Sequence, residues 1–158
     1  MKICFVCLGN IIRSPLAENI FRDLIQQGGL TSKYHLESAG TSAFHVGDPP
    51  DSRMRQVASK RGLEYTGQAR QFQREDLDRF DLIIAMDKAN LRYLSSRALT
   101  REQREKIRLM REYDRITSTD LDVPDPYYGG PEGFELTFDI VLRSCQGLFE
   151  ELEGGQKS

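Results

Sequence analysis

The sequence has little of several things that mark specialised classes of protein. It contains no tryptophan, two histidines and three cysteines in 158 residues, and no apolar run as long as a membrane-spanning helix needs. An odd number of cysteines does not suggest a disulfide framework. The chain also enters a strand-like segment directly, without the pattern of a signal peptide. We therefore expect a cytoplasmic protein that does not act at a membrane.

Neither sign of charge dominates the chain. The 22 Lys and Arg residues nearly balance 24 Asp and Glu residues, which gives a formal net charge of −2. No overall basic field therefore indicates a nucleic-acid partner. The length and the apolar content of 39% suit one domain with a substantial core. We assign residues 1–153 to that domain and residues 154–158 to a flexible tail.

Short apolar segments alternate with amphipathic ones. We expect strands at residues 3–6, 34–38, 82–86 and 107–110, helices at 14–27, 51–60, 87–94 and 134–152, and loops at 41–51 and 118–131. On the last helix we expect an inward stripe of Leu136, Ile140, Val141, Leu148 and Leu152. This alternation predicts an α/β fold in which helices flank an open parallel sheet. Such sheets bind ligands beyond the carboxyl ends of their strands.

The first strand ends in a segment with a chemical character of its own. Residues 6–15 read Val-Cys-Leu-Gly-Asn-Ile-Ile-Arg-Ser-Pro. Cys7 lies at the end of the strand and Arg13 at the start of a helix, for which Ser14 is the expected N-cap. A helix amino terminus, inward N–H groups and a guanidinium all stabilise a thiolate and a tetrahedral dianion. Arg13 can hold two oxygens of such an anion with its planar fork.

Two further features of this segment favour an anion-binding loop. Gly9 lets the backbone approach a ligand, and Asn10 tolerates the left-handed conformation that a tight loop requires. The Ser14 hydroxyl can donate to the thiolate. The alternative interpretation is a buried strand cysteine followed by an ordinary turn, because a motif match is only a hypothesis.

A carboxylate near the other end of the chain could supply proton transfer. Asp125 lies between Pro124 and Pro126, which stiffen its loop, and Tyr127 and Tyr128 follow. Such a carboxyl group can protonate a leaving oxygen and later accept a proton from water. The tyrosines can wall a slot for a flat ring. The alternative is a proline-rich turn whose tyrosines pack on the domain.

Together these segments resemble the low molecular weight protein tyrosine phosphatases. The resemblance rests on residues 7–15 and 125–129 and continues through 38–42, 46–51, 69–71 and 86–90, in the order of the family. It implies a flavodoxin-like fold with four parallel strands, and no metal or other cofactor. It also implies hydrolysis of phosphotyrosine and small aryl phosphates. The expected partners are tyrosine-phosphorylated proteins, with phosphate or other oxyanions in the site.

The resemblance also implies roles for individual residues. Cys7 would be the nucleophile that forms a phosphocysteine, Arg13 the phosphate clamp, and Asp125 the general acid and then the base. The phosphate-binding loop would consist of Cys7, Leu8, Gly9, Asn10, Ile11, Ile12, Arg13 and Ser14. Supporting residues would be Asn10, Ser14, Ser38 and Asp87, and the substrate rim would be Phe44, His45, Tyr127 and Tyr128.

Some of these roles have simpler alternatives. Asp87 could serve as the N-cap of the helix after the third strand, and His45 could be an ordinary surface residue. Asn10 would be linked to Ser38 by hydrogen bonds.

The chain departs from the family pattern at two positions. Many members have a second cysteine where this chain has Ile12, and a histidine where it has Gly67. Cys4 cannot replace that cysteine. Three strand steps separate its Cα atom from that of Cys7 by about 10 Å in total, and a disulfide bridges Cα atoms no more than roughly 7 Å apart. We expect Cys145 to be a packing residue of the last helix.

Two other functions fit the same loop. An arsenate reductase would need additional cysteines to resolve its adduct, and no cysteine occurs between Cys7 and Cys145. A phosphoryl carrier would have little use for Asp125, which activates water. The Cys4-Phe5-Val6-Cys7 spacing imitates a thioredoxin motif, but both cysteines precede the helix instead of opening it.

Overall fold

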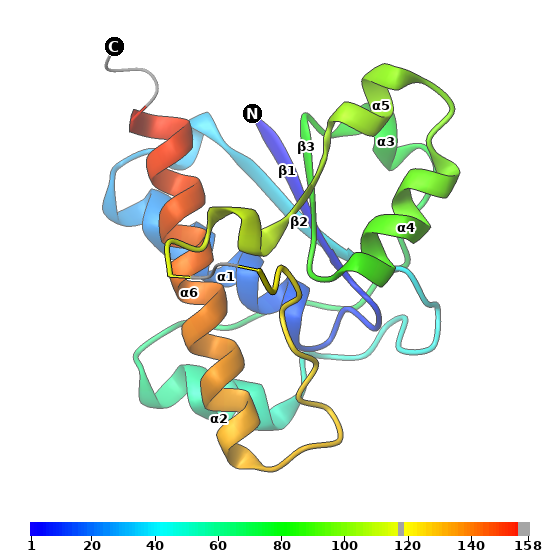
Figure 1. The fold of residues 1–158 in the computed structure, drawn as a ribbon. Helices are drawn as coiled ribbons and strands as arrows, with labels where there is room; N and C mark the ends of the chain where they lie inside the picture. Colours follow the sequence, from blue (N-terminus) through cyan, green and yellow to red (C-terminus); the bar gives the residue numbers. More distant parts are fainter. Residues whose placement is uncertain (117–118, 155–158) are drawn as a thin grey trace.

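A four-stranded parallel sheet forms the centre of the molecule (Figure 1). The computed structural model describes residues 1–116 and 119–154. The strands are β1 (Lys2–Cys7), β2 (His35–Gly40), β3 (Leu82–Ala85) and β4 (Ile107–Leu109), in the order β2-β1-β3-β4. The predicted α/β fold with four parallel strands is confirmed. The beginning of the predicted 118–131 loop and residues 155–158 of the predicted tail lie outside the described residues.

Helices cover both faces of the sheet. One layer contains α1 (Arg13–Gln27), α2 (Ser52–Lys60) and α6 (Pro131–Gly154). The other contains α3 (Asp76–Arg79), α4 (Lys88–Arg97) and α5 (Arg101–Glu105). Short 3-10 turns occur at Thr31–Lys33 and Met110–Tyr113. None of the helices in the described part of the chain is long and apolar enough to cross a membrane.

Side chains of β1 alternate between two buried clusters. Phe5 and Cys7 belong to the core beneath α1 and α6, whereas Cys4 and Val6 face the core beneath α4. This alternation follows from the two-residue period of a strand. Cys4 and Cys7 therefore lie on opposite faces of the sheet.

The first helix begins differently from the prediction. It starts at Arg13, and its N-cap residue is Ile12, which provides no side-chain cap. The prediction that Ser14 is the N-cap is wrong. Ser14 lies in the first turn, where its hydroxyl contacts the Cys7 sulfur and the Asn10 side chain instead of a backbone N–H.

Two other boundaries also differ from the prediction, one through strand pairing and one through proline geometry. Strand β2 continues to Gly40 because its end pairs with Cys7 in β1. Helix α6 begins at Pro131, a residue whose fixed φ suits a first helical position.

The predicted inward stripe of α6 is correct except at its start. Ile140, Val141 and Leu148 are buried and Leu152 is half-buried against the same core, but Leu136 is 53% exposed, so its place in the stripe is wrong. In the first turn Phe134 is the residue that faces the core. Leu136, two positions later, therefore lies on the opposite side of the helix.

Gly147 provides a test of how closely α6 packs against the segment after β4. A Cβ atom at Gly147 would lie 1.9 Å from the carbonyl oxygen of Tyr113. We expect Gly147→Ala to lower the free energy of unfolding by about 2 kcal/mol or more, because backbone would have to move. Urea denaturation followed by circular dichroism measures the change.

Gly154→Ala is the matched control on the same helix. No atom of the residues that the structure describes lies within 4 Å of a Cβ built there. Its expected effect is neutral or a gain of up to about 1 kcal/mol from helix propensity. Equal denaturation midpoints for the two variants would contradict the close contact at Gly147.

Candidate active site

The loop between β1 and α1, residues 8–12, wraps around the sulfur of Cys7. Asn10 has a φ of 58°, the left-handed conformation that the sequence predicts. Its backbone N–H donates to the Cys7 sulfur over 3.2 Å, and the Ser14 hydroxyl lies 3.0 Å from the same atom. Cys7 is 3% exposed and lies near the amino terminus of α1. These contacts place hydrogen-bond donors around the sulfur.

The Asn10 side chain is the centre of a hydrogen-bond relay. Its Nδ2 donates to the Ser14 hydroxyl over 2.7 Å and to the Ser38 hydroxyl over 3.0 Å. Its Oδ1 accepts from the backbone N–H of Arg70 over 3.0 Å. Ser38 in turn donates to Glu18 over 2.7 Å. The predicted link between Asn10 and Ser38 is confirmed, and the relay fixes the loop from three elements.

Arg13 is buried beneath the same loop. Its side chain is 3% exposed, and its NH1 group donates to Asp87 over 2.6 Å and to the carbonyl of Val123 over 3.1 Å. Its NH2 group lies 3.5 Å from the Asp125 carboxylate. Burial by itself lowers the pKa of the guanidinium, but the facing Cys7 sulfur and the two carboxylates raise it above its ordinary value. Arg13 is therefore a fixed positive charge.

Asp87 meets both of the interpretations that its sequence position allows. Its Oδ1 caps α4 by accepting from the Asn90 N–H over 2.8 Å, while its Oδ2 holds Arg13. One carboxylate thus ties the end of β3 to the guanidinium.

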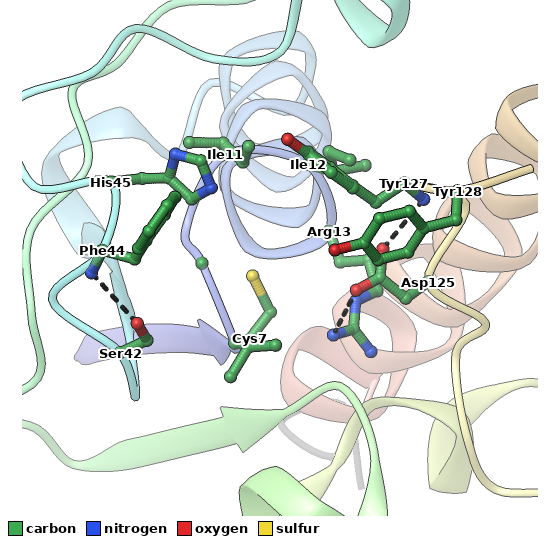
Figure 2. A pocket seen from close by; sticks show the side chains of 12 residues that line it. Cys7, Ile11, Ile12, Arg13, Ser42, Phe44, His45, Asp125, Tyr127 and Tyr128 are labelled. Carbon is green, nitrogen blue, oxygen red and sulfur yellow. Dashed lines mark hydrogen bonds and ion pairs between the residues drawn. The ribbon is translucent and has the colours of Figure 1, made fainter.

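A pocket opens over the Cys7 sulfur (Figure 2). It is lined by Cys7, Leu8, Gly9, Ile11, Ile12, Arg13, Ser42, Phe44, His45, Asp125, Tyr127 and Tyr128. The structure thus brings the predicted nucleophile, clamp, acid and rim residues together. Of the other predicted residues, Asn10, Ser14 and Asp87 are outside this lining and contact Cys7 or Arg13, which form part of it. Ser38 is also outside the lining and contacts Asn10.

Aromatic rings stand on two sides of the pocket (Figure 2). Phe44 and His45 pack edge to face at 4.8 Å, as do Tyr127 and Tyr128. Phe44 is 84% exposed and Tyr128 is 96% exposed, so both project into solvent. The His45 Nδ1 lies 3.0 Å from Asp48, which orients the imidazole. The two walls leave a slot that suits a flat ring.

Sequence reasoning missed several residues that hold the site. Tyr65 donates its hydroxyl to the Ile12 carbonyl over 3.0 Å, and burial raises its pKa well above the ordinary value. Glu18 ends the Asn10 relay. No local pattern marks either role, because Tyr65 contacts a loop residue 53 positions away and Glu18 contacts a strand residue 20 positions away.

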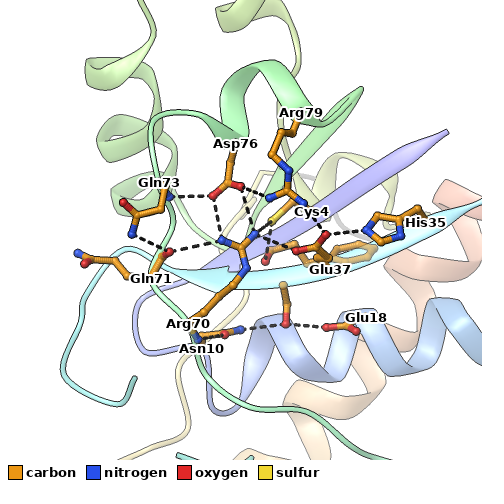
Figure 3. A network of polar contacts seen from close by, with 12 residues as sticks. Cys4, Asn10, Glu18, His35, Glu37, Arg70, Gln71, Gln73, Asp76 and Arg79 are labelled. Carbon is orange, nitrogen blue, oxygen red and sulfur yellow. Dashed lines mark hydrogen bonds and ion pairs between the residues drawn. The ribbon is translucent and has the colours of Figure 1, made fainter. Parts of the chain in front are cut away.

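A second polar network supports the relay from behind (Figure 3). The Arg70 guanidinium contacts Asp76 at 2.9 Å and Glu37 at 3.3 Å. Cys4 is buried beneath it, and this burial raises the thiol's pKa. Glu37 has a lowered pKa because contacts with His35, Arg70 and Arg79 outweigh its burial.

All three cysteines are free and buried. Cys145 packs in the core, as predicted, with its sulfur against the carbonyl of Ala17.

Comparison with known proteins identifies the family. Residues 2–158 match the family described as low molecular weight phosphotyrosine protein phosphatase. The chain belongs to this family. A low molecular weight protein-tyrosine-phosphatase of Streptomyces coelicolor is 42% identical over 158 residues, which cover 97% of this chain and 96% of the relative.

Two crystal structures of phosphatases are also similar. The Entamoeba histolytica protein tyrosine phosphatase, with Hepes in its active site, superposes with a TM-score of 0.93 at 42% identity and covers 99% of both chains. A Drosophila arginine phosphatase superposes with a TM-score of 0.89 at 34% identity, covering 96% of this chain and 98% of that chain. The pocket over Cys7 is thus the candidate active site of a low molecular weight phosphatase.

A substitution at Gly40 tests whether activity requires the loop around Cys7 to pack closely against the end of β2. A Cβ atom at Gly40 would lie 2.8 Å from the Leu8 carbonyl oxygen and 3.2 Å from the Asn10 Cβ. We expect Gly40→Ala to push the loop away and to lower kcat/KM for 4-nitrophenyl phosphate about tenfold or more. Steady-state kinetics measure this loss.

Gly28→Ala, at the far end of α1, is the control. Its added Cβ would make only ordinary contacts of 3.4 Å or longer. Gly28→Ala should have the same kcat/KM as the enzyme without a substitution. If Gly40→Ala also kept that kcat/KM, the prediction that the loop must pack closely would be wrong.

Proposed function

We propose that this protein is a tyrosine phosphatase that hydrolyses phosphotyrosine and small aryl phosphates through a phosphocysteine. The observation that carries the proposal is that one pocket is lined by Cys7, Arg13 and Asp125, although the last is far away in the sequence. A thiolate nucleophile, a fixed cation and a carboxyl group are the three parts that this reaction requires.

In the first step the Cys7 thiolate attacks phosphorus opposite the bond to the leaving oxygen. The S–P bond forms as the P–O bond breaks, and Asp125 gives its proton to the phenolic oxygen. Tyrosine or a phenol leaves, and phosphocysteine remains.

In the second step the Asp125 carboxylate takes a proton from a water molecule. The water oxygen attacks phosphorus and the P–S bond breaks. Phosphate and the Cys7 thiolate are released, and Asp125 is again protonated. Each residue is thereby restored for the next cycle.

Stabilisation of the equatorial oxygens is the largest expected contribution to the rate. The N–H groups of residues 8–12 and the amino terminus of α1 supply it together with Arg13. Hepes is a sulfonic acid, so its presence in the active site of the Entamoeba phosphatase supports an oxyanion site here.

The aromatic walls support a phenyl phosphate ester as substrate. A ring between Phe44 and Tyr128 would gain apolar and edge contacts along its faces. The proposed partners are therefore tyrosine-phosphorylated proteins. Phosphoarginine, suggested by the Drosophila relative, is the competing substrate. A phenyl ring presents a larger apolar area to these walls than a guanidinium does, so we expect phosphotyrosine peptides to be preferred.

An arsenate reductase is less well supported. Such an enzyme needs a second thiol close to the first. Cys4 lies on the opposite face of the sheet, and Cys145 is buried against α1.

The decisive test replaces the two reacting groups. Cys7→Ser should lower kcat for 4-nitrophenyl phosphate about 10⁴-fold or more, because an alcohol is a far weaker nucleophile than a thiolate. Asp125→Asn should lower kcat/KM for a phosphotyrosine peptide about 100-fold or more, because the leaving oxygen is no longer protonated. Steady-state assays with a phosphoarginine peptide alongside measure both losses and the preference.

Turnover that survives Cys7→Ser would refute the phosphocysteine route. A higher kcat/KM for the phosphoarginine peptide than for the phosphotyrosine peptide would refute the assigned substrate. Circular dichroism of both variants provides the check that they fold.

Oxidation gives an independent prediction. We expect hydrogen peroxide to inactivate the enzyme by converting Cys7 to sulfinic and sulfonic acids, because Cys4 cannot form a protective disulfide with it. Activity should not return with dithiothreitol. Trypsin releases both cysteines in one peptide, residues 3–13. Mass spectrometry should find added oxygens on that peptide, whereas loss of two hydrogens with recoverable activity would disprove the prediction.

A further inference from the structure

We infer that Arg53 is a positioning residue for the general acid. In this inference, which rests on the proposed function, Arg53 holds the acid loop, residues 124–130, over the pocket. Arg53 lies outside the lining of the pocket and touches no reacting atom.

Arg53 lies in the first turn of α2 and reaches two different segments. Its Nε and NH2 groups donate to the two oxygens of Asp51, over 3.2 Å and 2.9 Å. Its NH1 group donates to the backbone carbonyl of Tyr127 over 3.0 Å. The planar fork of a guanidinium can make these contacts together, which a lysine ammonium cannot do.

Two aromatic rings fix the same guanidinium. Its carbon lies 5.2 Å from the centre of the Tyr127 ring and 4.6 Å from that of Phe134. Phe134 is buried in the first turn of α6, directly after the acid loop. Arg53 therefore joins the acid loop to the ends of both α2 and α6, which lie side by side (Figure 1).

The contacts form a continuous route from the loop around Cys7 to the acid. The backbone N–H of Asp51 donates to the Ile11 carbonyl over 2.8 Å. The Asp51 carboxylate holds Arg53, which holds the Tyr127 carbonyl, and the Tyr127 N–H donates to Asp125 over 3.1 Å. Burial by itself raises the pKa of Asp51, but the contacts with Arg53 lower it below the ordinary value. Asp51 thus stays ionised and keeps its hold.

Asp125 needs such an external support. Its side chain is 42% exposed, and its carboxylate pairs with the Arg13 NH2 group at 3.5 Å. A bound phosphate would engage that guanidinium and compete for it. The contact between Arg53 and the Tyr127 carbonyl involves neither Arg13 nor the Asp125 carboxylate, so it can persist while substrate is bound. General acids lose much of their effect when displaced by about 1 Å.

The test compares leaving groups, because a displaced general acid slows poor leaving groups more than good ones. We expect Arg53→Gln to lower kcat/KM about tenfold for phenyl phosphate but only about twofold for 4-nitrophenyl phosphate. Arg55→Gln removes the same charge from an exposed position of α2 and should change neither value beyond about twofold. Equal losses for the two substrates, or none, would overturn the inference.

A double variant checks that Arg53 acts through Asp125. In an Asp125→Asn background, Arg53→Gln should cost no more than about twofold for phenyl phosphate, because the acid is already absent. A further tenfold loss there would overturn the inference. If the unaltered enzyme hydrolyses neither substrate, the proposed function itself fails. If Asp125→Asn shows its leaving-group effect and Arg53→Gln does not, only the role of Arg53 fails.

Discussion

The left-handed turn at Asn10 is the constraint on which the site depends. This conformation brings the Asn10 N–H to the Cys7 sulfur, and it is unfavourable for a residue with a Cβ atom. Three hydrogen bonds of the Asn10 side chain, to Ser14, Ser38 and the Arg70 backbone, offset that cost. Because the turn aims the Asn10 N–H at the sulfur, the hydrogen-bond environment of Cys7 depends on it.

The sheet order explains why distant segments meet at this loop. With β1 between β2 and β3, the carboxyl ends of these strands place Ser38 and Asp87 on either side of Cys7. Helix α1 after β1 and helix α2 after β2 belong to one layer, and α4 after β3 belongs to the other, so the loops that precede them diverge around the pocket. Asp87 connects this edge to Arg13 at the same point where it caps α4.

The acid loop belongs to no strand, so side chains must hold it. The residue before it is anchored near β3, because the Val123 N–H donates to the Met86 carbonyl. Further along, Arg53 holds the Tyr127 carbonyl. Tyr65 similarly holds the Ile12 carbonyl on the other side of the site. The molecule thus uses hydrogen bonds from helices and long loops to fix two backbone segments relative to one another.

Neighbouring residues set the hydrophobic period and the backbone preference, so the amino-acid order is enough to predict the four strands, the longer helices, the loop from Cys7 to Arg13 and the proline-flanked segment around Asp125. The short helices α3 and α5 are not predicted, because they lack an apolar stripe. The assignment of Leu136 to the inward face is wrong because apolar residues occur on two sides of the start of α6. Tertiary packing alone turns the Ser14 hydroxyl toward the sulfur and brings Tyr65 and Arg53 to loops 53 and 74 residues away. Those contacts depend on the path of the crossovers between strands, which no local pattern encodes.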